Sequence, residues 1–166
     1  LKSEKLINIY EIFEKPLIKI LAFMEIEGVE IDSKFLKSLS QKFKKKILLL
    51  EKEIFNISKK EFNIGSPKQL GEIIYNDLKI AGLKKTKKGG FATSASILED
   101  LAFKGNKFPK LILDWRQLSK LKNTYSDALP EHVNPTTKRV HTSFLLAATT
   151  TGSCLLYTSP SPRDRW

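Results

Sequence analysis

The chain has 166 residues, enough for one domain with a hydrophobic core and not much more. Apolar residues make up 41% of it, which excludes a largely disordered chain. Its 29 lysines and arginines outnumber its 18 aspartates and glutamates, and the formal net charge of +11 suits a polyanionic partner such as nucleic acid or an anionic membrane surface, although a well-solvated surface explains the charge equally well.

Two long helices are expected in the first part of the chain. Apolar residues at helical spacing predict a helix over 6–27, which contains Pro16 and ends at Gly28. Asp32 can then cap a second helix. Apolar residues recur along this second helix in steps of three or four and form one seam: Leu36, Leu39, Phe43, Ile47, Leu50, Ile54 and Ile57. Lysines cover its other faces, and a charged face of this kind is usually only solvated.

The stretch Ser66-Pro67-Lys68-Gln69 predicts the start of another helix. Ser66 can cap it, Pro67 suits its first position, and Gln69 completes a capping box. The free N–H groups and the positive end of the helix dipole form a site where a phosphate can bind, while a cap that serves stability alone is the alternative. Residues 82–92 follow as a basic, glycine-containing loop, GLKKTKKGGFA, for which plain solvation is again the alternative.

The second half of the chain predicts two more helices and a strand. One helix begins at about Thr93 or Ser94. Pro109 opens a longer helix that runs to about Ala128 and is buried through six residues: Leu111, Ile112, Trp115, Leu118, Leu121 and Tyr125. After a turn at 134–137, residues 138–145 alternate and predict a strand. The expected fold class is therefore mainly α, an antiparallel helical unit followed by the first strands of a sheet.

The last segment, 153–166, differs in character from the rest. The stretch CLLYTSPSPRDRW lacks any period and resembles one translated reading frame of the adapter DNA used in sequencing libraries. We therefore expect 153–166 to be foreign to the protein, with an ordinary C-terminal tail as the alternative. Cys154 is the only cysteine, which excludes an internal disulfide and a cysteine-based zinc site, and the two histidines, His132 and His141, are too few for a metal cluster.

Five segments, in order, resemble the polymerase domain of bacterial family A DNA polymerases. They are YEIFEKPLIKILAFMEIEGVEID (10–32), EFNIGSPKQLGEIIY (61–75), LKKTKKGGFATSASILEDLA (83–102), LILDWRQLSKLKNTYSDALP (111–130), and NPTTKRVHTSF followed by TTTG (134–144 and 149–152). Any one of these segments alone would be weak evidence for the family, but five of them in the right order and spacing make the resemblance specific. The resemblance implies that 1–31 is the helix at the base of the polymerase, 32–130 the thumb and 131–152 the start of the palm.

In that family the thumb closes over the minor groove of the primer–template duplex and holds it by its phosphates. The resemblance and the residue types together give these candidate DNA-binding residues: Ser66, Lys68 and Gln69; Lys84, Lys85, Thr86, Lys87 and Lys88; Thr93, Ser94 and Ser96; Lys120, Lys122, Asn123 and Thr124; and Arg139. The block Lys120 to Tyr125 departs from the family's KLKSTY only at Asn123, which keeps the capacity for hydrogen bonding.

Two further departures from the family are visible near the end of the resemblance. Leu145 and Leu146 stand where many members have Asn-Gln, and Ser153 stands where members have an arginine that reaches the primer. Ser153 lies at the junction with the adapter-like segment, so we do not expect it to be the protein's own residue.

The resemblance also defines what we expect the chain to lack. The family's two catalytic aspartates, which hold two Mg²⁺ ions for nucleotidyl transfer, lie beyond this sequence, so the intact polymerase would need Mg²⁺ while this part would carry no cofactor and no polymerase activity. We expect a monomer that binds primer–template duplex DNA in the bacterial cytoplasm, at the nucleoid, with no membrane association. Two alternatives remain: a non-enzymatic helical nucleic-acid-binding module, and a coiled-coil interaction protein that dimerises through the 36–57 seam.

Overall fold

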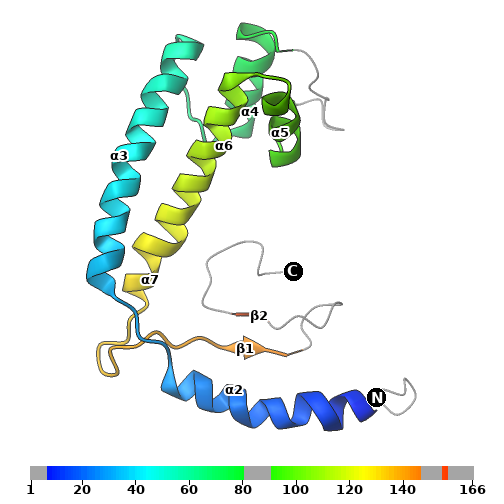
Figure 1. Ribbon diagram of the computed structural model, residues 1–166, viewed down its shortest axis with the longest axis vertical. Helices are drawn as coiled ribbons and strands as arrows, with labels where there is room; N and C mark the ends of the chain where they lie inside the picture. The colour runs from blue at the N-terminus through cyan, green and yellow to red at the C-terminus, as the bar shows by residue number, and fades with distance from the viewer. Residues whose placement is uncertain (1–6, 81–90, 147–154, 157–166) are drawn as a thin grey trace. The chain divides into compact units, whose positions relative to one another are not determined.

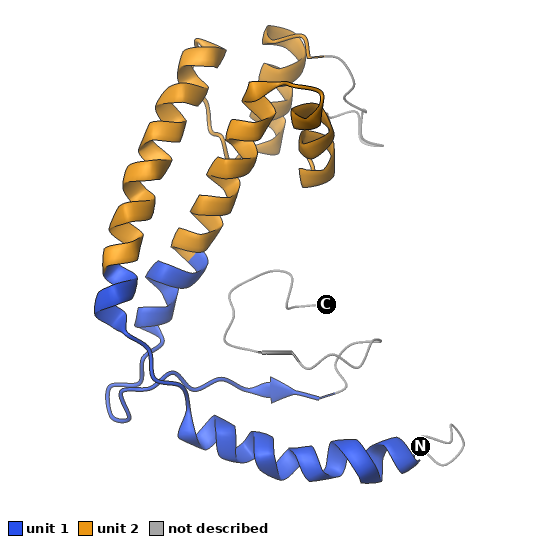
Figure 2. Cartoon of the chain, in the orientation of Figure 1, with its two compact units in different colours: residues 1–37, 124–166 blue, residues 38–123 orange. Residues whose placement is uncertain are grey.

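The computed structural model describes residues 7–80 and 91–146 and the backbone of 155–156. Helices account for most of these residues, which confirms the mainly α prediction (Figure 1). The chain divides into two compact units (Figure 2). Unit 1 combines 1–37 with 124–166, and unit 2 is the continuous stretch 38–123, which falls inside the predicted thumb.

Seven α-helices, three wide helical turns of π type and two short strands make up the described part of the chain. They are α1 (Ile7–Ile9), η1 (Tyr10–Glu14), α2 (Lys15–Glu27), α3 (Ser33–Ser58), α4 (Pro67–Glu72), η2 (Ile73–Asp77), α5 (Ala95–Phe103), α6 (Lys107–Lys120), η3 (Leu121–Asp127), α7 (Ala128–Glu131), β1 (Phe144–Leu145) and β2 (Leu155–Leu156). None of the helices in this described part has the length and apolar character needed to cross a bilayer.

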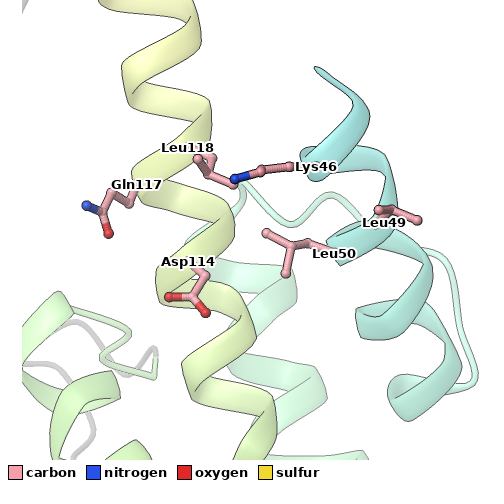
Figure 3. A pocket seen from close by; sticks show the side chains of 6 residues that line it. All are labelled: Lys46, Leu49, Leu50, Asp114, Gln117 and Leu118. Atoms are coloured by element: carbon pink, nitrogen blue, oxygen red, sulfur yellow. The ribbon is translucent and has the colours of Figure 1, made fainter. Parts of the chain in front are cut away.

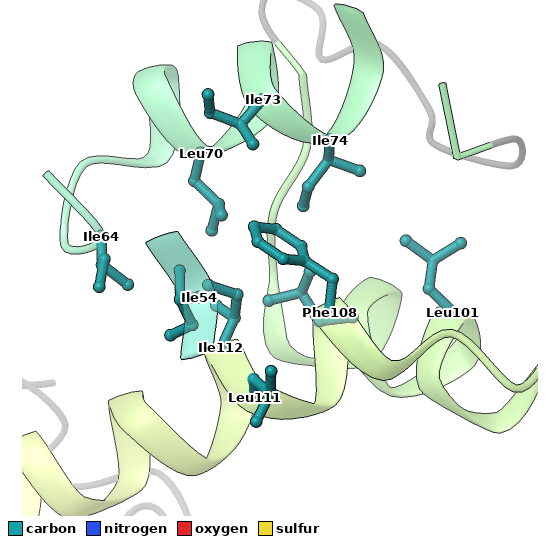
Figure 4. Close-up of a cluster of buried hydrophobic side chains, with 10 residues drawn as sticks. Ile54, Ile64, Leu70, Ile73, Ile74, Leu101, Phe108, Leu111 and Ile112 are labelled. Carbon is teal, nitrogen blue, oxygen red and sulfur yellow. The ribbon is translucent and has the colours of Figure 1, made fainter. Parts of the chain in front are cut away.

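The hydrophobic core lies in unit 2, where α3, α4, η2, α5 and α6 meet (Figure 4). Its buried members are Ile54, Ile64, Leu70, Ile73, Ile74, Leu98, Leu101, Phe108, Leu111 and Ile112. Because burying one such side chain contributes about 1.5–3 kcal/mol, this cluster is the main source of stability that fixes the helix starts carrying the candidate site.

The apolar seam of α3 packs against α6 of the same chain. The two helices lie side by side and run in opposite directions (Figure 1). Trp115 Nε1 donates a hydrogen bond of 3.0 Å to Glu51 Oε1, and Ile54 and Ile112, both 0% exposed, belong to the same core. The second half of the seam therefore packs within the chain, whereas the coiled-coil alternative needs a partner chain.

Unit 1 is organised around the end of α2. Gly28 ends that helix at φ +68° and ψ −178°, a conformation that other residues rarely adopt. Val29 then pairs with Val140 through two backbone hydrogen bonds of 2.8 and 2.9 Å. The amide of Phe144 donates to the Glu25 carboxylate at 2.6 Å. The predicted end of the first helix at Gly28 is confirmed. Glu25 and Val29, on either side of it, bind the segment 140–144 that leads into β1.

The predicted strand over 138–145 is much shorter than expected. Only Phe144–Leu145 forms a strand, paired antiparallel with Leu155–Leu156. Val140 is buried, but it bridges two separate residues, Val29 and Val133. A continuous strand needs a continuous partner, and the turn closed by the Lys138 amide on the Asn134 carbonyl supplies only a one-residue bridge.

The long helix predicted from Pro109 to Ala128 starts earlier and changes pitch. It begins at Lys107, and from Leu121 to Asp127 it widens into η3. Tyr125, which was predicted to be buried, is 41% exposed, while Ser126 is buried at 2%. A wider turn shifts the helix phase by about one residue, so the spacing of an ordinary helix places the wrong side chain in the core.

Candidate nucleic-acid interface

The start of α4 matches the predicted cap in part. Ser66 adopts an extended conformation at the N-cap and its side chain accepts the Gln69 amide at 3.5 Å. The Gln69 side chain does not complete a capping box, because the Ser66 amide already donates to the Asn63 carbonyl at 2.9 Å. Gln69 Oε1 accepts the Asn63 amide instead, at 2.7 Å. Lys68 is exposed in the first turn, so the helix start presents a cation and amide donors to solvent.

The start of α5 presents two hydroxyls. Ser94 is the N-cap residue and makes no side-chain cap bond, and its Oγ lies 3.1 Å from Ser96 Oγ. Both serines are exposed, whereas Thr93 is 7% exposed and its carbonyl accepts Arg116 Nη1 at 2.7 Å. Partial burial lowers the pKa of Arg116 from its ordinary value. Ser94 and Ser96 are therefore the accessible donors of this group, and Arg116 holds the backbone beneath them.

The lysine-rich candidates fall in two places. Lys84, Lys85, Thr86, Lys87 and Lys88 lie outside the described residues. The second group lies at the end of α6 and in η3: Lys120 and Asn123 are exposed, while Lys122 and Thr124 are half-buried. All four residues stay candidate contacts, with Lys120 and Asn123 the most accessible.

Arg139 and His141 are held in unit 1. Arg139 Nε donates to the Gly28 carbonyl at 3.3 Å, and its Nη1 lies 3.7 Å from Glu27 Oε1. His141 Nδ1 donates to the Glu25 carbonyl at 2.9 Å, and its Nε2 lies 2.6 Å from Thr137 Oγ1. Both side chains brace the end of α2, which supports a packing role for His141 and leaves the contact of Arg139 with DNA as a prediction.

An open pocket of about 430 Å³ lies between α3 and α6 (Figure 3). Leu49, Leu50 and Leu118 give it an apolar lining, and Lys46 reaches from α3 toward α6. Asp114 is the only carboxylate among the described residues that line it. Among the described residues, no group of three His, Cys, Asp or Glu side chains is placed to hold a metal ion. The pocket therefore offers neither a pair of carboxylates for acid–base work nor a metal centre.

Sequence reasoning missed one contact that joins two of the candidate groups. Phe91 stacks on Tyr75 with ring centroids 3.9 Å apart and an angle of 16° between the rings. A Cβ on Gly71 would come within 2.7 Å of Phe91 Cβ. The signal that could have found it is Gly71 itself, because a glycine inside a helical pattern usually has a packing reason.

Comparison with known proteins places this geometry in context. The family model for DNA polymerase family A matches residues 33–161, a range that reaches into the segment predicted to be foreign. DNA polymerase I of Rhizobium leguminosarum is 49% identical over 152 residues, which is 92% of this chain and 15% of that protein. The thermostable DNA polymerase I of Thermus caldophilus is 43% identical over 151 residues, or 90% of this chain and 18% of that protein. The chain thus spans less than a fifth of these relatives.

A solved structure shares the fold. The POL domain of Pol1 from M. smegmatis, in complex with a DNA primer-template and dNTP, superposes with a TM-score of 0.78 at 31% sequence identity. The match covers 91% of this chain and 26% of that one.

Proposed function

The chain belongs to DNA polymerase family A, and from that premise we propose that it is the duplex-holding thumb region of a bacterial DNA polymerase. The observation that carries the proposal is the match over 91% of this chain to a polymerase domain whose structure contains a primer-template. In this proposal the parent protein carries out template-directed nucleotidyl transfer in replication and repair, and this part grips the product duplex.

The residues at the two helix starts support a grip through phosphates: Lys68, Ser94 and Ser96 are exposed, and Ser66 is half-buried. Ser66 and Lys68 at α4, and Ser94 and Ser96 at α5, combine amide donors, hydroxyls and a cation, which are the groups that position a protein on a nucleic-acid backbone. None of these groups reads a base edge, so the grip would depend little on sequence. The basic charge of the chain supplies the long-range attraction.

Nucleotidyl transfer itself is not assigned to these residues. The Mg²⁺ ions that we expect for the intact enzyme find no set of three ligands among the described side chains. Three aspartates lie on different helical elements: Asp100 on α5, Asp114 on α6 and Asp127 on η3. They do not form such a ligand group. We propose that the chain alone has no polymerase activity and acts as a monomer in the cytoplasm, at the bacterial nucleoid.

The test is duplex binding as a function of salt. Fluorescence anisotropy with a labelled primer–template duplex should show weak binding that falls steeply between about 50 and 200 mM salt, because bound lysines release counterions. The double variant Lys68→Gln/Lys120→Gln should bind more weakly and lower the slope of log K against log salt by about 2, one unit for each phosphate that is no longer neutralised.

The control is Lys110→Gln, which removes one exposed charge from α6 outside the predicted contacts. It should leave the salt slope unchanged. A binding constant for the unaltered chain that does not move with salt, or primer extension by the purified chain, contradicts the proposal.

A further inference from the structure

The two helix starts in the proposed grip belong to segments that are far apart in the sequence. Ser66 and Lys68 begin the α4–η2 segment, and Ser94 and Ser96 begin α5. Hydroxyls and amides contact a phosphate backbone productively only if their spacing is fixed, because a displacement of about 1 Å lengthens a hydrogen bond beyond its useful range. Some contact in unit 2 must therefore hold one helix start against the other.

The shared core joins these segments below the surface, and the stack of Phe91 on Tyr75 is a second, direct contact between them. The rings are nearly parallel, at 3.9 Å between centroids and 16° between planes. Gly71 lies four residues before Tyr75, so the two share a helix face, and the missing Cβ of Gly71 leaves the space that Phe91 Cβ occupies. Gly71 and Tyr75 thus form a slot on α4–η2 into which the side chain of Phe91 fits.

Neighbouring backbone contacts extend this fixed point toward α5. Two residues after Phe91, the Thr93 carbonyl accepts Arg116 Nη1 at 2.7 Å. The Leu98 amide donates to the Ser94 carbonyl at 3.1 Å, and Leu98 is 0% exposed in the core. The chain from Phe91 to Leu98 is therefore held at a ring stack, a carbonyl and a buried side chain, with Ser94 and Ser96 presented from it.

We propose that Phe91 and Tyr75 are positioning residues for duplex binding, which fix the hydroxyls of Ser94 and Ser96 relative to the Ser66–Lys68 helix start. The inference rests on the proposed function and explains how the spacing between the two helix starts is fixed. Neither ring contacts DNA in this proposal. The rings act only through the segments that they join, and Gly71 is the residue that makes their close approach possible.

The experiment compares the removal of two aromatic pairs in the same unit. Phe91→Leu keeps an apolar side chain but removes the stack on Tyr75. Phe55→Leu removes the edge-on contact between Phe55 and Phe62, whose centroids are 5.8 Å apart, and serves as the matched control. Tyr75→Phe keeps the ring and serves as the conservative variant. The 166-residue chain is used throughout, with anisotropy on a labelled duplex at low salt and melting temperature as readouts.

The expected result is a loss of duplex affinity of about three- to tenfold for Phe91→Leu, which corresponds to one or two displaced hydrogen bonds. Tyr75→Phe should bind the duplex normally. Phe55→Leu should also bind it normally, even if its melting temperature falls as much as that of Phe91→Leu. Ser94→Ala/Ser96→Ala should weaken binding in the unaltered chain and have no further effect in the Phe91→Leu background.

A second readout needs no DNA and separates the two proposals. In the free chain, Phe91→Leu should speed exchange of the Leu98 amide, which bonds the Ser94 carbonyl, whereas Phe55→Leu should not. The positioning role is overturned if the Leu98 amide exchanges equally fast in Phe91→Leu and Phe55→Leu. It is also overturned if these two variants have equal melting temperatures and lose equal duplex affinity. Absence of duplex binding by the unaltered chain overturns the proposed function and the DNA part of this inference, and Leu98 exchange then still decides whether the stack holds the start of α5.

Discussion

Helices α2 and α6 are both rich in apolar residues, yet they use them differently. In α6 the apolar residues gather on one face, and Phe108, Leu111 and Ile112 are buried in the core. In α2 they are distributed around the helix, and Ile18, Phe23 and many others remain exposed, with Ile26 at 78%. The difference shows that apolar content alone does not produce a core; a helix buries its apolar residues where they share one face that a neighbour covers.

The same contrast separates the two units as wholes. Among the described residues, unit 1 buries Val140 as its one core hydrophobe, and it is ordered largely by hydrogen bonds around Gly28 and Glu25. Unit 2 holds the hydrophobic cluster. Unit 2 should therefore carry most of the stability of the chain, while unit 1 depends on a few polar contacts and on backbone geometry.

The largest effect should come from emptying the core of unit 2. Ile112→Ala should lower the free energy of unfolding by about 3 kcal/mol, because it removes buried methyl groups and leaves a cavity. Ile20→Ala, at a side chain 54% exposed on α2, should change it by less than about 0.5 kcal/mol. Urea titration followed by the fluorescence of Trp115, in a Trp166→Phe background, measures both. Equal losses would remove the distinction between the helices.

A smaller effect is expected from the backbone of unit 1. Gly28→Ala should cost about 2 kcal/mol, because its φ of +68° disfavours a side chain and its Cβ would lie 2.8 Å from the His141 ring. Amide exchange of Val29 and Val140, which bond each other, should speed up accordingly.

The control for that change is Gly105→Ala. Gly105 also has a positive φ, +87°, but nothing lies within 4 Å of its added Cβ. Its cost should be about 1 kcal/mol, from conformation alone, and exchange at Val29 and Val140 should not respond. A Gly28→Ala variant that behaves like Gly105→Ala would mean that the contact with His141 does not constrain unit 1.

The smallest effect should come from a surface ion pair in unit 2. Lys60 Nζ lies 2.9 Å from Asp77 Oδ1, and the lysine side chain is 62% exposed. Lys60→Met should cost at most about 0.5 kcal/mol, because solvent screens the pair, and the difference should vanish at high salt. A loss comparable with that of Ile112→Ala would show that charge, and not the core, stabilises this unit.

Much of the helical fold follows from the sequence, because its signals are local. The end of the first helix at Gly28 and the N-cap at Ser66 depend on neighbouring residues only, and both are confirmed. The exposed Tyr125 was mispredicted because η3 changes the helical repeat, which no local pattern announces. The strand over 138–145 failed because its length depends on a distant partner.

For the candidate site too, the features set by local sequence could be predicted, and those set by contacts between segments could not. The residue types at the helix starts could be predicted from the sequence, and the structure places Lys68, Ser94 and Ser96 at the surface. The burial of Thr93 and the contact of Phe91 with Gly71 and Tyr75 depend on how segments pack and could not be predicted. Whether any of these residues touches DNA stays a prediction.

The pairing of Val29 with Val140 also bears on the order in which the chain folds. Gly28 and Arg139, beside this pair, are 111 residues apart in the sequence, so joining them closes a long loop and costs entropy that grows with the logarithm of its length. The residues of unit 2 lie inside that loop, and all of them are synthesised before Val140. Once unit 2 has condensed, the loop is effectively shorter, so the collapse of one unit lowers the kinetic barrier to closing the other.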